Sequence, residues 1–239
     1  KFNFPLKIIS TNLPIGIIFK AGVSAQIKSA VMLAGLNSFG DTKILEKQKS
    51  RDHTENMLLK NKEVIKVVNK KNKLINISGK KYLNPIKINV PGDPSSSAFF
   101  CALTLLNPGS QLKIKNVGLN PTRLGFYNLL KNQKARILFE NVKKDNNEIK
   151  GDVIVKSSNL KPIKASREYY VKATDEYPIL FVIAALVKGI SIFKGIDDLA
   201  NKESNRIKEM QKVLKQAGVK SIFSKNKLKI FGKGVMNLK

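Results

Sequence analysis

One order of predicted elements occurs three times along this chain of 239 residues, about every 70 to 80 residues. Each pass reads helix, strand, helix and two hairpin strands, because apolar residues recur first at helical spacing and then alternate. We expect helices that begin at Ser24, Pro94, Thr122 and Lys202, and helices over residues 52–60 and 179–187. We expect strands over residues 42–45, 64–68, 74–77, 112–114, 136–139, 153–155, 190–193, 219–223 and 228–230.

This repeat limits the fold more than any other feature of the sequence. Units of this kind pack against one another and do not build one doubly wound sheet. The units share few residues, so the repetition lies in the architecture. We therefore expect a mixed α/β protein, of the α+β kind, built from repeated helix-strand-helix-hairpin units.

A proline-flanked segment separates the first unit from the second. Residues 86, 88 and 90 are isoleucine or valine, and this alternation predicts a short strand between Pro85 and Pro91. Prolines at both ends are typical of a connection between domains. We place a domain boundary near residue 90, and a cleft between the two parts would be the natural place for a ligand.

The formal net charge of +27 indicates an anionic partner. We do not expect nucleic acid, since only five of the 44 basic residues are arginine, tryptophan is absent, and the lysines are spread along nearly the whole chain. The abundance of Lys, Asn and Ile is typical of AT-rich coding. Small anionic substrates fit better with isolated polar motifs.

The scarcity of histidine and cysteine excludes several classes of site. His53 is the only histidine and Cys101 the only cysteine, which argues against a zinc site, a disulfide framework and a Ser-His hydrolase. Cys101 lies in an apolar run, so we expect a buried thiol and not a nucleophile. No apolar run approaches the roughly 20 residues that span a bilayer, and we expect a cytoplasmic protein without membrane contact.

Residues 201–209 hold two cations beside a carboxylate. In a helix that begins at Lys202, the like charges of Lys202 and Arg206 would stand one turn apart and cost about 0.2 to 0.5 kcal/mol. An anion would relieve them, and Glu203 is placed to move a proton. An apolar stripe with a terminal glycine supports the helix: Ile207, Met210, Leu214, Ala217 and Gly218. The alternative is a solvated, charged helix start.

Two other helix starts carry groups that bind anions. Ser24, Gln26 and Lys28 place a hydroxyl, an amide and an ammonium where free N–H groups and the helix dipole favour phosphate. Ser50 and His53 open the next helix in a similar way. One face of the first helix is apolar: Ile27, Ala30, Val31 and Ala34. The alternative for both segments is an ordinary cap followed by an amphipathic helix.

Two helix starts are acidic. Asp93 and Pro94 suit the cap and the first position of a helix, and three serines follow. Asp175 and Glu176 precede a very apolar helix, where capping and the dipole are sufficient to account for them. Local structure explains both segments. The alternative for the first is that its small residues let two domains approach closely, and the alternative for the second is a functional role of the carboxylates.

Six segments, taken in order, closely resemble the 5-enolpyruvylshikimate-3-phosphate synthase (3-phosphoshikimate 1-carboxyvinyltransferase) family, in its glyphosate-tolerant bacterial branch. The segments are residues 24–30 (SAQIKSA), 50–55 (SRDHTE), 91–98 (PGDPSSSA), 120–123 (NPTR), 175–178 (DEYP) and 202–204 (KES). Each is weakly diagnostic alone, whereas six in this order are specific. The resemblance covers the whole chain.

The resemblance implies an enzyme of the shikimate pathway, which leads to chorismate and the aromatic amino acids. Such an enzyme transfers the enolpyruvyl group of phosphoenolpyruvate to the 5-hydroxyl of shikimate 3-phosphate and releases phosphate, without a metal or an organic cofactor. The implied fold is an inside-out α/β barrel of two domains with three units each. Residues 1–89 would be the last unit of one domain and residues 90–239 the first two units of the other, in a monomer.

The same resemblance implies roles for particular residues. The residues expected at shikimate 3-phosphate are Ser24, Ala25, Gln26, Ser50, His53, Asp175 and Lys202. Gln26 and Arg206 would bind phosphoenolpyruvate. Asp175 and Glu203 would be catalytic, Asp175 at the attacking hydroxyl and Glu203 at the methylene carbon of phosphoenolpyruvate.

The chain also departs from the family pattern. Asn205 replaces the aspartate of the usual Lys-Glu-Ser-Asp-Arg motif, and the preceding Arg-Val is Ala200 and Asn201. The family's early lysine and arginine segments, its Asn-Gly-Gly-Thr-type loop and its later Asp-His-Arg segment are absent. We therefore expect a fragment truncated at both ends and inactive by itself. The alternatives are a noncatalytic anion-binding remnant and the UDP-N-acetylglucosamine enolpyruvyl transferase of cell-wall synthesis, whose loop cysteine has no counterpart here.

Overall fold

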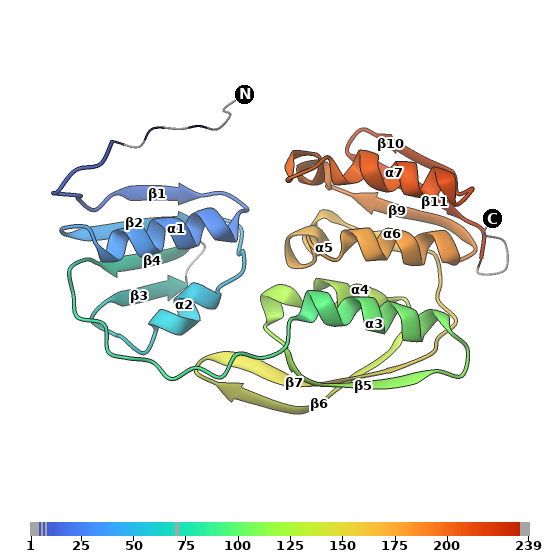
Figure 1. Cartoon of the computed structure of the whole chain (residues 1–239), viewed down its shortest axis with the longest axis horizontal. Helices are drawn as coiled ribbons and strands as arrows, with labels where there is room; N and C mark the ends of the chain where they lie inside the picture. The colour runs from blue at the N-terminus through green and yellow to red at the C-terminus, as the bar shows by residue number, and fades with distance from the viewer. Residues whose placement is uncertain (1–4, 6, 8, 70–71, 235–239) are drawn as a thin grey trace. The chain divides into compact units, whose positions relative to one another are not determined.

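The computed structural model describes residues 5, 7, 9–69 and 72–234 (Figure 1). The chain divides into two compact units, Lys1–Lys87 (unit 1) and Ile88–Lys239 (unit 2). Within the described residues, no helix has the length and apolar character needed to cross a membrane.

Unit 1 is a four-stranded sheet with two helices. Its elements are β1 (Ile18–Ala21), α1 (Ala25–Leu36), β2 (Asp41–Glu46), α2 (His53–Leu58), β3 (Ile65–Asn69) and β4 (Lys73–Ser78). The strand order is β1-β2-β4-β3, with β1 parallel to β2 and the other pairs antiparallel. A small core joins the helices to the sheet: Met32, Ile44, Leu58, Ile65, Ile75 and Ile77.

Unit 2 begins with a three-stranded antiparallel sheet. Its first elements are α3 (Pro94–Leu106), β5 (Gln111–Gly118), the 3₁₀ turn η1 (Pro121–Arg123), α4 (Gly125–Asn132), β6 (Arg136–Asp145) and β7 (Glu148–Lys156). The strand order is β5-β7-β6. Asp93 caps α3 as expected, since its carboxylate accepts from the backbone N–H of Ser96 at 2.8 Å.

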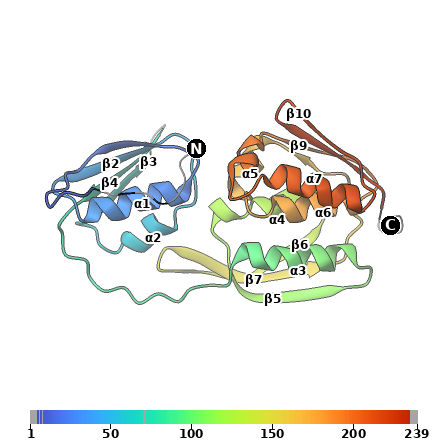
Figure 2. The ribbon, with the colours of Figure 1, turned by 45° about the horizontal axis from the view of Figure 1, so that its top comes forward.

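The second half of unit 2 has a sheet of its own, in the order β10-β11-β9-β8. Its elements are β8 (Lys164–Ala165), α5 (Arg167–Lys172), α6 (Tyr177–Leu186), β9 (Gly189–Lys194), the 3₁₀ turn η2 (Asp197–Asn201), α7 (Arg206–Gln216), β10 (Ser221–Ser224) and β11 (Lys227–Gly232). Helix α6 packs against both α3 and α7 (Figures 1 and 2). The strongly apolar sequence of α6 is therefore buried between its neighbours.

The predicted threefold repeat is confirmed in the order of the elements and in the pairing of the strands. Each pass contains three strands. The first strand pairs with the third, and the third also forms a hairpin with the second. The three matching orders are β2-β4-β3, β5-β7-β6 and β9-β11-β10. Hydrophobic periodicity was sufficient to find these elements because each sheet has one face on a core.

The predicted strand at residues 86–90 is wrong. This segment has no strand pairing, and Ile88 and Val90 are 43% and 78% exposed. Pro85 and Pro91 favour extended backbone, but proline lacks the N–H that a ladder requires. Between the hairpin strands predicted over residues 64–68 and 74–77, positions 70 and 71 lie outside the described residues.

Only Val31 of the apolar face expected on α1 packs against the core of unit 1. Ile27, Ala30 and Ala34 are exposed, and the buried residues of the helix are Lys28, Met32 and Gly35. Cys101, in contrast, is buried in α3 as expected. Burial raises the pKa of its thiol to about 12, so it stays protonated and unreactive at neutral pH.

Candidate functional site

The site residues predicted from the sequence fall into two groups, one in each unit. In unit 1 they are Ser24, Ala25, Gln26, Ser50 and His53, and in unit 2 they are Asp175, Lys202, Glu203 and Arg206. Every one of them lies at the start of a helix or in the loop that precedes one.

The start of α1 has the cap that the sequence predicts. Ser24 is the N-cap, and its hydroxyl oxygen accepts from the backbone N–H of Ile27 at 3.3 Å. Ala25 is half-buried and Gln26 is exposed. The first turn carries no acidic residue, so the helix dipole there is not neutralised by the helix itself. The cap is shown, and anion binding by Ser24, Ala25 and Gln26 stays a prediction. The contribution expected from the Lys28 ammonium is wrong, because that ammonium is buried and paired with Glu46 and Glu55.

Helix α2 begins beside α1. His53 is its first residue and is exposed. The hydroxyls of Ser29, in the second turn of α1, and Thr54, in the first turn of α2, lie 2.7 Å apart. Because this bond connects α1 to α2, the two helix starts are held in a defined relation to each other.

Ser50 faces the interior of unit 1. It is 3% exposed, and its backbone N–H and hydroxyl both donate to Oε1 of Glu46, at 2.9 and 2.6 Å. The side chain thus organises the loop before α2. Its expected contact with a substrate stays a prediction.

Glu46 belongs to four buried charges, the buried quartet, which we did not predict from the sequence: Lys28, Glu46, Glu55 and Lys73. Lys28 Nζ lies 2.9 Å from Glu46 Oε1 and 2.7 Å from Glu55 Oε1. Lys73 Nζ lies 2.9 Å from Glu55 Oε1 and 3.6 Å from Glu46 Oε2. None of the four is more than 7% exposed, and their formal charges sum to zero.

A signal for the buried quartet is present in the sequence. Lys28 is in helical register with the buried Met32 and Gly35, and Glu46 alternates with the buried Ile44. Lys73 begins a strand whose alternate residues are also buried. A charge at a core position must be paired, so this register indicates that each charge is buried with a partner of opposite sign, but it does not show which segment supplies the partner.

The pKa of Glu46 shows that its neighbours stabilise the charged carboxylate in spite of its burial. Burial by itself would raise this pKa, but hydrogen bonds from Ser50 and Lys28 more than offset that effect and hold it below its ordinary value. Burial likewise opposes the charge on Lys73, yet Glu55 holds the pKa of Lys73 above its ordinary value. Both groups are therefore ionised at neutral pH.

In unit 2, Arg206 connects the two predicted catalytic carboxylates. Its Nη1 lies 3.3 Å from Oδ1 of Asp175, and its Nη2 lies 3.0 Å from Oε2 of Glu203. Asp175 precedes α6 and Glu203 precedes α7, so one guanidinium holds two segments together. The three side chains remain 25% (Arg206), 39% (Asp175) and 82% (Glu203) exposed, which leaves the group open to a ligand.

The helix predicted from Lys202 starts four residues later, at Arg206. Lys202 and Glu203 lie in the loop before it, so Lys202 and Arg206 are not a like-charge pair on one helix. The reason is Asn205, which is the N-cap and accepts from the backbone N–H of Lys208 at 3.0 Å. Asparagine caps helices as well as aspartate does. This departure from the family motif therefore keeps the helix start.

The protein itself supplies the anions expected to relieve the two cations. Asp198 Oδ2 lies 2.8 Å from Lys202 Nζ, and Arg206 has its two carboxylates. Burial lowers the pKa of Arg206, but Asp175 and Glu203 more than compensate and raise it. The pKa of Glu203 is held below its ordinary value by its own backbone N–H and by Arg206. Glu203 is thus a base at neutral pH.

Glu176 has a different role from the expected helix cap. It stands at the N-cap position of α6 without a side-chain cap bond, and it is 1% exposed. Its Oε1 accepts from the Ser95 hydroxyl at 2.5 Å, and Arg123 donates to that same serine oxygen at 2.6 Å. Arg123 also pairs with Asp93 at 2.9 Å. These contacts tie the starts of α3 and α6 together beside Asp175.

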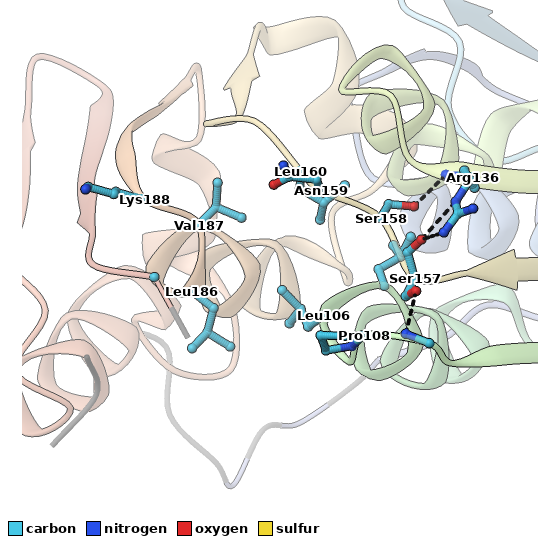
Figure 3. A pocket seen from close by; sticks show the side chains of 13 residues that line it. Leu106, Pro108, Arg136, Ser157, Ser158, Asn159, Leu160, Leu186, Val187 and Lys188 are labelled. Atoms are coloured by element: carbon cyan, nitrogen blue, oxygen red, sulfur yellow. Dashed lines mark hydrogen bonds between the residues drawn. The ribbon is translucent and has the colours of Figure 1, made fainter. Parts of the chain in front are cut away.

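A cavity of about 590 Å³ opens elsewhere in unit 2 and contains none of the predicted site residues (Figure 3). Leu106, Leu186 and Val187 line it, and Arg136 lies at one side. The guanidinium of Arg136 donates to the backbone carbonyl of Ser157, so its charge is already engaged (Figure 3). Among the described residues, no group of three or more His, Cys, Asp or Glu side chains is placed to hold a metal ion.

Comparison with known proteins gives one consistent result. Residues 1–237 match the family model of EPSP synthase (3-phosphoshikimate 1-carboxyvinyltransferase). The chain is 42% identical over 219 residues to the 3-phosphoshikimate 1-carboxyvinyltransferase of Aquifex aeolicus, covering 91% of this chain and 51% of that protein. It is 44% identical over 217 residues to the protein of the same name from Thermodesulfovibrio yellowstonii, covering 90% and 48%.

Solved structures agree. The EPSP synthase of Acinetobacter baumannii superposes with a TM-score of 0.80 at 36% identity, covering 93% of this chain and 50% of that one. The enolpyruvyl transferase NikO of Streptomyces tendae shares the fold, with a TM-score of 0.62 at 13% identity. The chain spans about half the length of the curated relatives it matches.

Proposed function

The chain belongs to the EPSP synthase family, and from this membership we propose that it takes part in enolpyruvyl transfer from phosphoenolpyruvate to the 5-hydroxyl of shikimate 3-phosphate. The reaction releases inorganic phosphate and belongs to the shikimate pathway. We take the protein as a cytoplasmic monomer that binds these two small molecules and no nucleic acid.

The observation that carries the proposal is the ion cluster around Arg206. Addition of the hydroxyl to phosphoenolpyruvate requires one proton to leave the hydroxyl oxygen and another to reach the methylene carbon. Two carboxylates, Asp175 and Glu203, are held on one guanidinium from separate segments. Two proton-transfer groups at a fixed spacing, beside cations, are what this reaction needs.

The proposed roles follow from that arrangement. Asp175 accepts the proton of the 5-hydroxyl as its oxygen attacks C2 of phosphoenolpyruvate, and Glu203 in its acid form donates to the methylene carbon. The tetrahedral intermediate then loses phosphate while Glu203 takes a proton back from the new methyl group. The lowered pKa of Glu203 suits that second step, in which it is the base.

Cations and helix starts supply the binding in this proposal. Lys202 contacts shikimate 3-phosphate, and Arg206 contacts the anionic groups of phosphoenolpyruvate. In unit 1, Ser24, Ala25 and Gln26 bind the phosphate of shikimate 3-phosphate at the N-terminus of α1, with Gln26 also near phosphoenolpyruvate. Ser50 and His53 complete that side from the start of α2.

Two measurements test the proposal. Calorimetric titration of the 239-residue chain with shikimate 3-phosphate should show binding, and phosphate release with both substrates should be absent because this chain spans half of its relatives. A chimera that places this chain in the matching half of the Aquifex aeolicus relative should release phosphate. In the chimera, Asp175→Asn and Glu203→Gln should each lower kcat by about 100-fold or more.

The outcomes separate the proposal from its alternatives. A chimera that binds shikimate 3-phosphate without turnover would identify a noncatalytic remnant. Full activity in both carboxylate variants would remove the assigned roles. Phosphate release by the 239-residue chain alone would overturn the expectation that it is inactive.

A further inference from the structure

Lys202 is held in place by residues that the family motif does not include. Its ammonium pairs with Asp198 at 2.8 Å, and Asp198 also accepts from the Tyr170 hydroxyl at 2.7 Å on the same Oδ2. Tyr170 is only 4% exposed, whereas the side chains of Lys202 and Asp198 are 27% and 36% exposed. A buried hydroxyl thus fixes a carboxylate, which fixes a partly open cation.

Tyr170 is held by residues that flank Asp175 in the sequence. Its carbonyl oxygen accepts from the Ala173 N–H at 3.2 Å and from the Thr174 hydroxyl at 2.9 Å, directly before Asp175. Its ring packs edge-on against that of Tyr177, two residues after Asp175, at 5.3 Å between centroids. The position of Tyr170 is therefore coupled to the segment that carries Asp175.

The turn that carries Asp198 is anchored on its other side. The amide of Asn226, in the β10–β11 hairpin, exchanges two hydrogen bonds of 2.8 Å with the backbone N–H and the side chain of Asp197. Burial would raise the pKa of Asp198, but Lys202 and Tyr170 more than offset this and lower it. Asp198 is thus ionised at neutral pH and contacts both Lys202 and Tyr170.

These contacts close a ring around the candidate site. Tyr170 bonds Asp198 and also Thr174, the neighbour of Asp175. Asp198 pairs with Lys202, and Arg206 pairs with both Asp175 and Glu203, the neighbour of Lys202. We propose that Tyr170 and Asp198 are positioning residues, which hold the Lys202 ammonium at a fixed distance from Asp175 and leave its remaining N–H groups for an anionic substrate. The choice of shikimate 3-phosphate as that substrate rests on the proposed function.

The reactivity of Lys202 tests the inference without catalysis. The 239-residue chain is labelled with a trace of acetic anhydride, and the rate at Lys202 is measured by peptide mass spectrometry against Lys212 as the internal reference. Asp198→Asn should raise the rate at Lys202 by about two- to fivefold, the effect of losing an exposed ion pair. Tyr170→Phe should raise it less, about twofold, because Asp198 keeps its charge and loses its anchor.

Matched controls come from the adjacent residues. Tyr169→Phe removes a hydroxyl that bonds Asn132 instead, and Asp197→Asn keeps an oxygen that accepts from Asn226. Both should leave the rate at Lys202 unchanged, and Asp198→Glu should restore most of the protection. Thermal unfolding midpoints within about 2 °C of the parent would show that the labelling change is local.

Two results decide the matter. Folded Asp198→Asn and Tyr170→Phe variants with parental labelling at Lys202 would overturn the inference. Shikimate 3-phosphate should slow the labelling of Lys202 in the parent chain. If the variants alter labelling and shikimate 3-phosphate does not, the positioning role stands and the proposed substrate fails.

Discussion

Both units contain a cluster of cations and carboxylates, but the cluster of unit 1 is buried and that of unit 2 is partly exposed. The buried quartet of unit 1 is at most 7% exposed, whereas Glu203 in unit 2 is 82% exposed and its partner Arg206 25%. In the quartet every charge meets an opposite charge inside the protein, so no cation remains for a ligand. In unit 2 the same kinds of residue keep one side in solvent. Depth therefore separates a structural ion cluster from a candidate site.

The energetic consequences should differ as sharply as the burial. Removing one member of a buried cluster leaves an uncompensated charge in a low-dielectric interior, and that is far more costly than losing a partly exposed pair. Variants that alter one cluster and spare the other therefore measure how much burial adds to the cost of losing a charge.

The largest effect is expected from Lys28→Met. It leaves Glu46 and Glu55 with Lys73 as their remaining cation, and it should destabilise unit 1 by about 3 to 5 kcal/mol. Arg206→Met in unit 2 should cost about 1 kcal/mol or less. Amide hydrogen exchange measured separately for peptides of α1 and α7 would report each unit. Equal losses of protection in the two variants would contradict the distinction by depth.

Acid should weaken unit 1 through Glu46. Its pKa is below the ordinary 4.5 in the folded chain, so its contribution is complete above about pH 4.5 and is lost as the pH falls through the folded pKa. Lys73 has a raised pKa and loses its contribution only above its ordinary 10.5. Urea unfolding followed by hydrogen exchange at pH 7 and pH 3.5 should show this loss in α1 and β2.

The control for the acid effect is Glu46→Gln at both pH values. This variant should be less stable than the parent at pH 7, and the difference between them should shrink at pH 3.5. A difference that stays constant would show that Glu46 is not the titrating group.

Ser50→Ala should have an intermediate effect. The hydroxyl donates to the charged Glu46 at 2.6 Å, and its loss should destabilise unit 1 by about 1 to 3 kcal/mol. Ser96→Ala is the matched control, because its hydroxyl donates to Asp93 at an exposed helix cap, at 2.9 Å. A cost in Ser50→Ala no larger than in Ser96→Ala would mean that the Glu46 carboxylate finds another donor.

The smallest effects are expected at Asn205. Asn205→Ala removes the N-cap of α7 and should cost about 1 kcal/mol, whereas Asn205→Asp, the usual residue of the family motif, should change stability by less than about 0.5 kcal/mol. Exchange protection in α7 measures both. A large gain in Asn205→Asp would show that asparagine weakens this helix start.

Local features of the fold were predictable from the sequence. The caps Ser24 and Asp93 and the helix end at Gly218, with its positive φ of 69°, depend on neighbours within a few residues. The buried Cys101 followed from the apolar run around it. The strand expected at residues 86–90 failed because alternation alone does not show whether a pairing partner exists.

Long-range charge pairing was not predictable in the same way. The partners Lys28 and Glu46 are 18 residues apart, and Asp175 and Arg206 are 31 apart. The start predicted for α7 was wrong. We placed it at Lys202 from the spacing of the charges, whereas the N-cap Asn205 starts the helix at Arg206. The charges of one segment do not show which carboxylates of other segments will pair with them, as Asp175 pairs with Arg206.

The threefold repeat, the caps Ser24 and Asp93 and the family could be read from the sequence, because each depends on the order and spacing of residue types along the chain. The tertiary structure alone decided which charges became buried partners and which stayed open. That decision depends on the distances between segments and on their shared exclusion of water, since a charge is stabilised in the interior only where an opposite charge meets it. Lys28 and Lys202 are alike in the sequence and differ in the folded chain for that reason.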